Sequence, residues 1–480
     1  MQNHKTILLL MILVSPLTVF AERVTAPERA HGSQGSWIFP DDGAEKVITL
    51  ERAYSFALAE NPTIKILQER VMQAEAARLK AWSTLKPTAN FQGTFTHYDQ
   101  EISVDFAESY AGTLEYMADV FGLTLPDPMP DMGESEPIVM QKQNQFAFNA
   151  IAKLPLFVGP AYPGLKMAYK NVRIARLSQM RSKQDFLLQV ARAYYLVVSQ
   201  KEIVRSLANK IAVDRRHQAA AKVRLEVGKS TRADVLRADL IETQDVQNLR
   251  AADNNLRAAK RQLAILLGLG GTVDVEKPGE PDDLKGTERD MLVLASSNRA
   301  DYRAASLAIR AAEHGKNAVW WGFAPSLDMS FMYRWSEAAG FANRQGSWAL
   351  IFTANLPIYD GDLRYANLRE SQSKVREATQ QQRAVAQSIA SGIVQLRADL
   401  KSSEAGVISA QKAVKLATIL AADMEASFEA GAATQLDVLD TTQRQLEAEI
   451  QLTNSLFQRD LARLALDHAL GTFDPAKGKS

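Results

Sequence analysis

The chain contains an internal duplication, and this repeat constrains its fold more than any other feature. Six short motifs of the first half return in the same order in the second half. The matching pairs are Ala59-Glu60-Asn61-Pro62 with Ser296-Ser297-Asn298-Arg299, Leu85-Lys86-Pro87-Thr88 with Phe323-Ala324-Pro325-Ser326, Leu154-Pro155-Leu156-Phe157 with Leu356-Pro357-Ile358-Tyr359, Glu226-Val227-Gly228 with Glu429-Ala430-Gly431, Asp234-Val235-Leu236 with Asp437-Val438-Leu439, and Leu267-Gly268 with Leu470-Gly471. Six motifs in register indicate two structural repeats, at residues 48–271 and 288–473.

The spacing between matching motifs changes at one place. The offset is about 237 positions at Asn61 and at Pro87, and about 203 positions at every later motif. Pro87 and Pro155 are about 68 positions apart, whereas Pro325 and Pro357 are about 32 positions apart. The first repeat therefore carries about 36 extra residues between its two expected strands. This insertion is acidic and includes Pro126, Pro128 and Pro130, which favours a long loop over 99–143.

Long helices are expected in each repeat. In the first repeat, segments 50–85, 162–226 and 232–268 are rich in helix-forming residues and almost free of Pro and Gly. At about 1.5 Å per residue the middle segment is about 100 Å long, and the other two, end to end, would match it. In the second repeat a three-four spacing marks a coiled-coil seam, with a second apolar stripe beside it. Two stripes on one helix favour packing on both sides, as in the wall of a tube.

Four short segments alternate between apolar and polar residues with a period of two. They are expected strands at about 88–98, 144–154, 326–335 and 347–356. Their length of about 9–11 residues is that of a tilted membrane strand. Tyr98, Trp335 and Trp348 lie toward the strand ends away from the prolines, where an aromatic girdle belongs. A soluble sandwich is the alternative.

Strand number then predicts an oligomer. Small closed barrels need about eight strands, and an open sheet edge is not viable in lipid. Four strands per chain must therefore be completed by other copies of the chain. The polar face of the strands would line a wet pore; it holds Asn90, Gln92, Thr94, Thr96, Asp328, Ser330 and Arg334.

The N-terminus has the pattern of a secretory signal peptide over 1–21. Lys5 precedes an apolar stretch, and Val19-Phe20-Ala21 forms a small-residue cleavage site. An uncleaved anchor is the alternative. No later segment is long and apolar enough to be expected as a spanning helix. Residues 22–47 and 272–287 are interpreted as linkers, and 474–480 as a tail.

Composition excludes several classes of protein. The chain has no cysteine, which removes disulfides, thiolate catalysis and Cys-ligated metals. Its formal net charge of +1 gives no basic field for nucleic acid. Gly228-Lys229-Ser230-Thr231 imitates the end of a phosphate loop, but it lies in a helix–turn–helix context, and Val223 replaces the required Gly. The six histidines are scattered. We therefore expect no enzyme, no cofactor and no metal site.

From about 48 to 473 the chain resembles the TolC-type outer-membrane efflux family. The resemblance rests on the duplication, the Leu-Pro…Gly starts of the long helices, the tip glycines Gly228 and Gly431, and the Leu-Gly ends at Gly268 and Gly471. It implies an α+β membrane protein: a homotrimeric twelve-stranded β-barrel in outer-membrane lipid, with four strands per protomer, continuous with a long periplasmic α-helical barrel. It further implies an exit duct that docks a periplasmic adaptor (membrane fusion) protein and an inner-membrane pump of the RND, ABC or MFS class.

The resemblance also places the functional residues. The adaptor-contact tips are Val227, Gly228 and Lys229 in the first repeat and Ala430, Gly431 and Ala432 in the second. By position, Asp437 and Asp440 match the aspartates that ring the family's periplasmic entrance. Each tip Gly also has a simple structural role, which is to end a helix in the left-handed conformation. Similarly, Asp234 and Asp437 complete capping boxes with Thr231 and Thr434, so Asp440 is the better candidate for a gate.

The chain departs from the family pattern at the entrance. The family's type member has a Tyr and an Arg at the positions of Phe428 and Ala433. Neither Phe428 nor Ala433 can replace the hydrogen bond or the salt bridge of those residues. We therefore expect another closed-state network, with Arg237 and Asp440 as the candidate pair. The other functional class left open is a non-conducting scaffold or adhesin stalk. The sequence does not specify the substrate or the pump.

Overall fold

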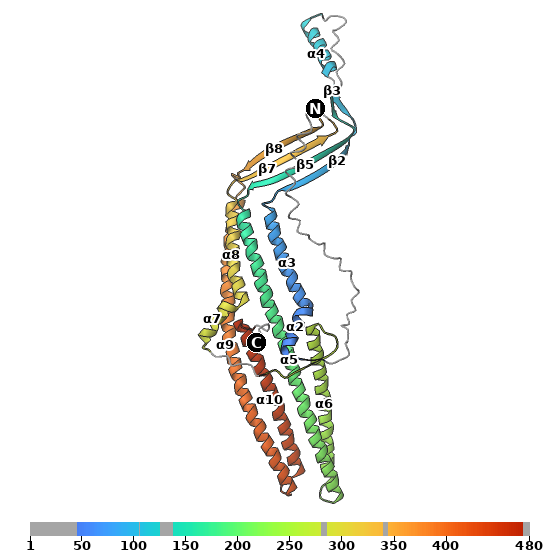
Figure 1. The fold of residues 1–480 in the computed structure, drawn as a ribbon, viewed down its shortest axis with the longest axis vertical. Coiled ribbons are helices and arrows are strands. Elements are labelled where there is room, and N and C mark those ends of the chain that lie inside the picture. The colour runs from blue at the N-terminus through green and yellow to red at the C-terminus, as the bar shows by residue number, and fades with distance from the viewer. Residues whose placement is uncertain (1–45, 105, 125–137, 280–285, 339–343, 474–480) are drawn as a thin grey trace.

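The computed structural model describes residues 46–104, 106–124, 138–279, 286–338 and 344–473. Within these residues the chain is long and narrow. A twisted sheet lies near one end, long helices descend from it, and two helical hairpins reach the opposite end (Figure 1). The expected signal peptide at 1–21 and the tail at 474–480 lie outside the described residues.

The upper helices occur as matched pairs. In the first repeat α2 (Leu50–Glu60) is followed by α3 (Pro62–Ser83), and in the second α7 (Glu288–Asn298) is followed by α8 (Ala300–Trp321). The expected single helix over 50–85 is therefore wrong. Asn61 is extended, with ψ 128, because a residue before proline is displaced from helical geometry. Arg299 occupies the same junction in the second repeat, so the structural counterpart of Asn61 is Arg299 and not Asn298.

Two long helices form the spine of the molecule. α5 (Ala161–Glu226) has 66 residues and α9 (Leu363–Glu429) has 67. At a rise of about 1.5 Å per residue, each is about 100 Å long. α6 (Arg232–Leu267) and α10 (Gln435–Leu470) fold back on them as hairpins of equal length. α3 lies along the upper part of α5, and α6 lies along its lower part (Figure 1).

The sheet consists of four antiparallel strands in the order β2-β5-β7-β8. Their bounds are Thr88–His97, Asn144–Phe157, Ser326–Ser336 and Gly346–Asn355. The register confirms the expected parity, because the apolar residues of neighbouring strands pair with one another; Phe95 lies opposite Phe146, and Tyr333 lies opposite Trp348. This apolar face is largely exposed. β2 and β8 are the two edges of the sheet.

A second group of aromatic residues lies where strands meet helices. Phe157 packs edge-on against Trp321, with ring centroids 6.1 Å apart, and Phe323 packs against Tyr365 at 5.3 Å. Together with Trp335 and Trp348 at the far strand ends, the sheet has aromatic residues at both rims, as membrane strands do. Only the far rim was predicted from the sequence.

The described part of the insertion in the first repeat forms strands and a helix instead of the expected loop. β3 (Ile102–Val104) pairs with β4 (Ile138–Gln141), and α4 (Phe106–Phe121) lies beyond this ribbon. The three prolines that favoured a loop lie outside the described residues. An amphipathic pattern precedes them and forms the helix.

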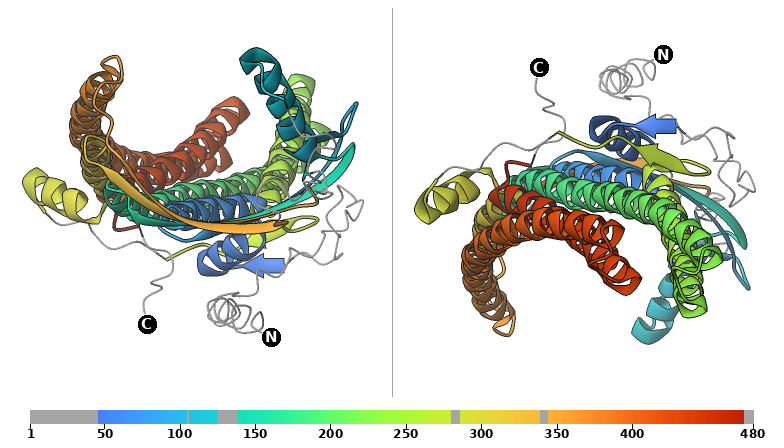
Figure 2. Two further views of the ribbon diagram at one scale, coloured as in Figure 1. Left: turned by 90° about the horizontal axis from the view of Figure 1, so that it is seen from above. Right: turned by 90° about the horizontal axis from the view of Figure 1, so that it is seen from below.

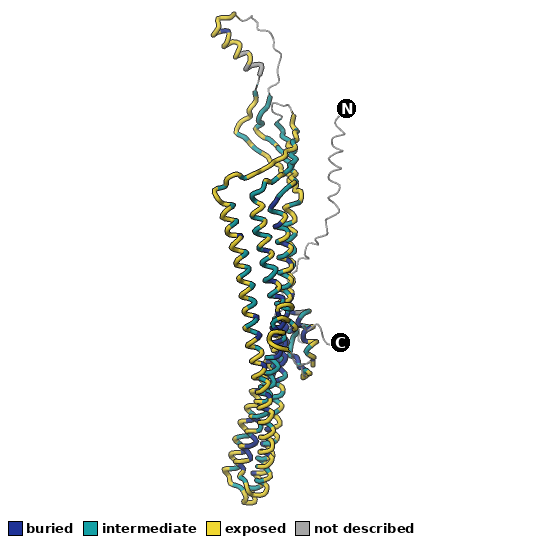
Figure 3. Tube along the Cα trace, turned by 90° about the vertical axis from the view of Figure 1, so that its left-hand side faces the viewer, coloured by how far each residue is buried: buried dark blue, intermediate teal, exposed yellow. Residues whose placement is uncertain are grey.

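The two expected linkers meet at the middle of the molecule. β1 (Lys46–Ile48) pairs in parallel with β6 (Val273–Val275). The hydroxyl of the fully buried Tyr194 lies 3.0 Å from the Ile48 carbonyl oxygen and 2.7 Å from that of Glu276. Burial raises the pKa of Tyr194 to about 12. Figure 3 shows buried residues concentrated at this level and in the lower hairpins.

Among the described residues, one helix meets the length and hydropathy expected of a membrane span, contrary to the sequence expectation. It is α9, and only 17% of its most apolar stretch is buried within the chain. α9 packs against α10 and α8 as one continuous rod. Its apolar residues therefore belong to the two-sided packing of a helical wall.

Candidate functional site at the helical tips

Both hairpin tips use one backbone design. At the end of α5 the Lys229 N–H donates to the Arg224 carbonyl at 2.7 Å, and the Gly228 N–H donates to that of Leu225 at 3.0 Å. This is a Schellman closure, and Gly228 has the left-handed φ of +70 that it requires. At the end of α9 the Ala432 N–H donates to the Ser427 carbonyl at 2.8 Å, and Gly431 has a φ of +81. The left-handed role expected of both glycines is confirmed.

Each tip then starts the next helix with a capping box. Thr231 accepts from the Asp234 N–H, and the Thr231 N–H donates to the Asp234 carboxylate at 3.0 Å. Thr434 and Asp437 make the same pair of bonds. These bonds to the Thr side chain and backbone lower the pKa of both carboxyls below the ordinary value. The capping expected of Asp234 and Asp437 is confirmed, and both are ionised at neutral pH.

The six residues predicted to contact an adaptor are all exposed. Val227, Gly228 and Lys229 lie at the first tip, and the second tip presents its own set: Ala430, Gly431 and Ala432. The chemistry of the two tips differs, because the first presents an ammonium and an isopropyl group where the second presents methyl groups. Their contact with an adaptor stays a prediction.

The predicted gate residues have local partners. Arg237 lies 3.6 Å from Asp234, one turn back on α6, and Asp440 accepts from Arg444 at 2.8 Å, one turn further on α10. Within the described chain, Arg237 and Asp440 do not pair with each other. Short-range partners on the same helix satisfy each charge at lower conformational cost than a contact between hairpins.

Two contacts that the sequence did not predict join the hairpins near their tips. The Arg224 guanidinium lies 3.9 Å from the centre of the Phe428 ring, a cation–π contact between α5 and α9. About two helical turns above it on α5, His217 lies 3.5 Å from Glu425. Burial lowers the pKa of His217, and Glu425 opposes this shift. Phe428, which cannot donate a hydrogen bond, thus provides its ring face to Arg224.

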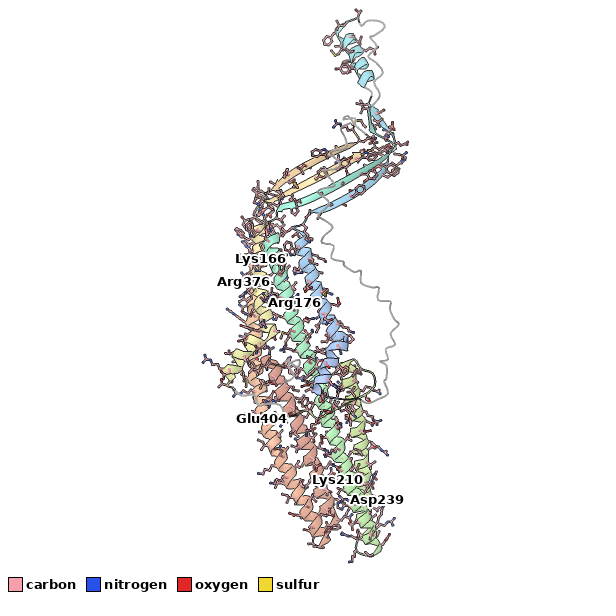
Figure 4. The ribbon with its side chains drawn as sticks, in the orientation of Figure 1. Lys166, Arg176, Lys210, Asp239, Arg376 and Glu404 are labelled. Carbon is pink, nitrogen blue, oxygen red and sulfur yellow. The ribbon has the colours of Figure 1, made fainter. Side chains whose placement is uncertain are left out.

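A buried cluster of charges lies higher in the first hairpin, around Lys210 (Figure 4). Lys210 is bonded to Asp214 on α5 and lies 3.3 Å from Asp245 on α6. All three side chains are at most 5% exposed. Burial raises the pKa of Asp214 to about 6, while Lys210 opposes the rise. One Asp214 oxygen has no hydrogen-bond partner among the described residues. The pair Lys210 and Asp214, four residues apart on one helix, could have been recognised in the sequence.

These features define a class of protein. A four-stranded sheet with one exposed apolar face and two aromatic rims continues into helical hairpins of tunnel length, as in outer-membrane channels with a helical tunnel. The sequence model described as outer membrane efflux protein matches residues 53–269 and 291–472. The chain belongs to this family and is an outer-membrane protein of the TolC type.

Known relatives agree with this assignment. The outer membrane protein TolC of Escherichia coli K12 is 26% identical over 341 residues, which are 65% of this chain and 66% of that protein. OprJ of Pseudomonas aeruginosa is 27% identical over 331 residues, or 65% of this chain and 64% of that protein. The chain thus spans just under two thirds of the length of these relatives. The crystal structure of VceC from Vibrio cholerae shares the fold, with a TM-score of 0.68, 17% identity, and coverage of 88% of this chain and 96% of that one.

Proposed function

We propose that this protein is the exit duct of a tripartite efflux or type I secretion system. Substrates delivered by an inner-membrane pump, through a periplasmic adaptor, would cross the outer membrane in it passively. One observation carries the proposal. A membrane-sized sheet, open at both edges, continues into helices of about 100 Å, longer than any compact domain needs.

Closure of the sheet requires further copies of the chain. β2 and β8 each leave one side without a strand partner among the described residues. Three copies joined β2 to β8 give a closed barrel of twelve strands, and the hairpins below give a helical barrel in the periplasm. The apolar face then meets lipid, which removes the cost of its exposure to water.

The polar face of the sheet supports a water-filled lumen. The register aligns Gln92, Asn149, Arg334 and Ser347 as a polar row across all four strands. A stalk without a conducting role would have no need of such a row. This face is mixed rather than wholly polar, because apolar residues interrupt it: Ile151, Met332 and Ile351.

The tips would then lie at the end of the duct that is directed toward the pump. In the proposed trimer the exposed residues at 227–229 and 430–432 face the adaptor, and the carboxylates of Asp440 and Asp437, with Asp234 and Arg237 beside them, surround the periplasmic entrance. Rings of carboxylates attract cations and exclude anions. Energy for transport comes from the pump, of the RND, ABC or MFS class.

Site-specific cross-linking tests the role of the tips. Because the chain has no cysteine, Lys229→Cys and Ala432→Cys each provide a single attachment point for a photoactivatable cross-linker. In intact cells, both variants are expected to capture a periplasmic adaptor. The control is Ser391→Cys, an exposed position near the middle of α9 and remote from the tips, which should capture none. Capture at Ser391 as strong as at the tips, or capture at none of the three, would contradict the proposal.

A further inference from the structure

α4 is a helix whose exposed apolar face has no partner within the described chain. It lies between β2 and β5, in the insertion that the second repeat lacks, at the end of the molecule opposite the tips (Figure 1). Tyr110 and Phe121 are 66% and 67% exposed, which is unusual for aromatic side chains on a helix. α4 has 16 residues, and a helix of that length is marginal in water unless another surface covers its apolar face.

Four of the exposed apolar residues of α4 form a seam. Tyr110, Leu114, Met117 and Phe121 follow one another at intervals of four, three and four, the spacing of coiled-coil contact positions. At about 3.6 residues per turn these four lie within about 60° of one another around the helix. Glu115 lies on the opposite side with Asp119, and both are exposed. The seam is thus suited to another helix and the side of Glu115 and Asp119 to water, while the exposed Tyr116 and Val120 lie between them.

The position of α4 selects among possible partners. Both views of Figure 2 place it on the concave side of the curved sheet and helices. In a tube built from several such walls, the concave sides face the axis and the convex sides face lipid. α4 also lacks any Lys or Arg, which an anionic lipid surface would favour. Position and charge therefore favour a second copy of α4 over the membrane surface.

We propose that the α4 helices of three copies pack around the axis through the Tyr110–Leu114–Met117–Phe121 seam and form a cap over the outer mouth of the duct. The cap rests on the proposed trimer and adds to it a constriction at the end remote from the periplasmic gate. β2, the strand that leads into the insertion, is also the edge strand that would join a neighbouring copy. Each α4 is therefore attached to the sheet beside the proposed interface between neighbouring subunits.

Disulfide cross-linking tests the cap. Leu114→Cys and Met117→Cys lie on the seam, and Glu115→Cys is the matched control between them on the opposite face. Under mild oxidation of the assembled protein in membranes, the seam variants should form subunit dimers because their Cα atoms approach within disulfide range. Because each cysteine can form only one disulfide, one subunit of each trimer must stay unpaired. The fraction of subunits recovered as disulfide-linked dimer should therefore be at most about two thirds. The Glu115→Cys control should give a yield of disulfide-linked dimer about tenfold lower.

The results of these experiments distinguish a failure of the cap proposal from a failure of the duct proposal. Native mass spectrometry of the purified protein first establishes the number of subunits. A trimer whose seam variants cross-link no better than Glu115→Cys overturns the cap and leaves the duct intact. A protein that is not trimeric overturns both. Quenching of a fluorophore on Leu114→Cys by brominated lipid would place the seam in the membrane and overturn the cap as well.

Discussion

The two helical hairpins share a backbone plan but differ in what they bury. α5–α6 and α9–α10 close with the same Schellman turn and the same capping box. In the first hairpin Lys210, Asp214 and Asp245 form a buried charge cluster. The matching positions of the second repeat are all alanine: Ala413, Ala417 and Ala448. Turn chemistry thus maintains the symmetry of the wall, while the side chains along it give the two hairpins different electrostatics.

The largest expected effect comes from breaking the buried cluster. Lys210→Met leaves two carboxylates buried without their cation, and this should lower the free energy of unfolding of the helical region by about 3–5 kcal/mol. Denaturant unfolding in detergent, followed by circular dichroism, measures it. The matched control is Lys412→Met, at an exposed lysine of α9. This control should change stability by at most about 0.5 kcal/mol.

Making the first hairpin apolar like the second sharpens the comparison. Replacing the whole cluster with Lys210→Met, Asp214→Leu and Asp245→Leu should restore most of the stability lost in Lys210→Met, because no unpaired charge remains. A triple variant as unstable as the single one would show that packing, and not charge burial, distinguishes the hairpins.

The pH dependence of stability should differ between the hairpins. The pKa of Asp214 is raised from 3.8 to about 6, so the folded chain binds a proton more tightly than the unfolded chain does. Its stabilising contribution is present below about pH 4 and is lost as pH rises through about 6. Relative to Asp214→Asn, the wild type should lose about 1–3 kcal/mol over this range. The same buried region also contains three other charged or titratable groups, Lys210, Asp245 and His217. These three residues must therefore be unchanged in both proteins that are compared.

An exposed carboxylate of the second hairpin provides the pH control. Asp423→Asn on α9 should give a stability–pH curve parallel to that of the wild type between about pH 4 and 6. If Asp214→Asn also runs parallel to the wild type, Asp214 does not titrate in this range, and the buried cluster does not set the difference between the hairpins.

Equal turns should respond equally to loss of their caps. Thr231→Ala and Thr434→Ala each remove a side chain that accepts a hydrogen bond at the helix start. Each loss should cost about 1 kcal/mol. Thermal unfolding of both variants, beside Thr418→Ala in the exposed interior of α9, measures it. If the two variants lose stability by amounts that differ by much more than experimental error, the two tips are not equivalent.

The smallest expected effect concerns the contact that joins the hairpins. Phe428→Leu removes the aromatic face beneath Arg224. It should weaken the interaction by about 0.5–1 kcal/mol. A double-mutant cycle with Arg224→Gln isolates this value from the loss of packing. A coupling energy of zero would mean that the two side chains are neighbours without a stabilising contact.

Regular repeats made much of the fold predictable. Strand parity follows from alternation along β2, β5, β7 and β8, and the cross-strand register confirms it. The tip glycines and capping boxes follow from local turn chemistry. Asn61-Pro62 was recognised as a repeat landmark but not as the helix break that proline imposes. The helix α4 was missed because the prolines after it dominated the interpretation of the insertion.

The site was less predictable because its contacts are tertiary. Arg224 meets Phe428, and Lys210 meets Asp245, only through the packing of helices that are distant in sequence. Arg444, the partner of Asp440, lies four positions away and was available from helical spacing alone. The entrance roles of the four predicted gate residues remain proposals, as does adaptor contact at the tips; the gate residues are Asp440, Asp437, Asp234 and Arg237.

Ion conductance of the purified protein in planar lipid bilayers tests the central claim most directly. If three copies enclose a water-filled duct, insertion should produce discrete conductance steps. Asp440→Ala, which removes the exposed carboxylate proposed to ring the entrance, should reduce the preference for cations. A trimer that inserts into the bilayer without conducting ions would contradict the account and favour a non-conducting stalk.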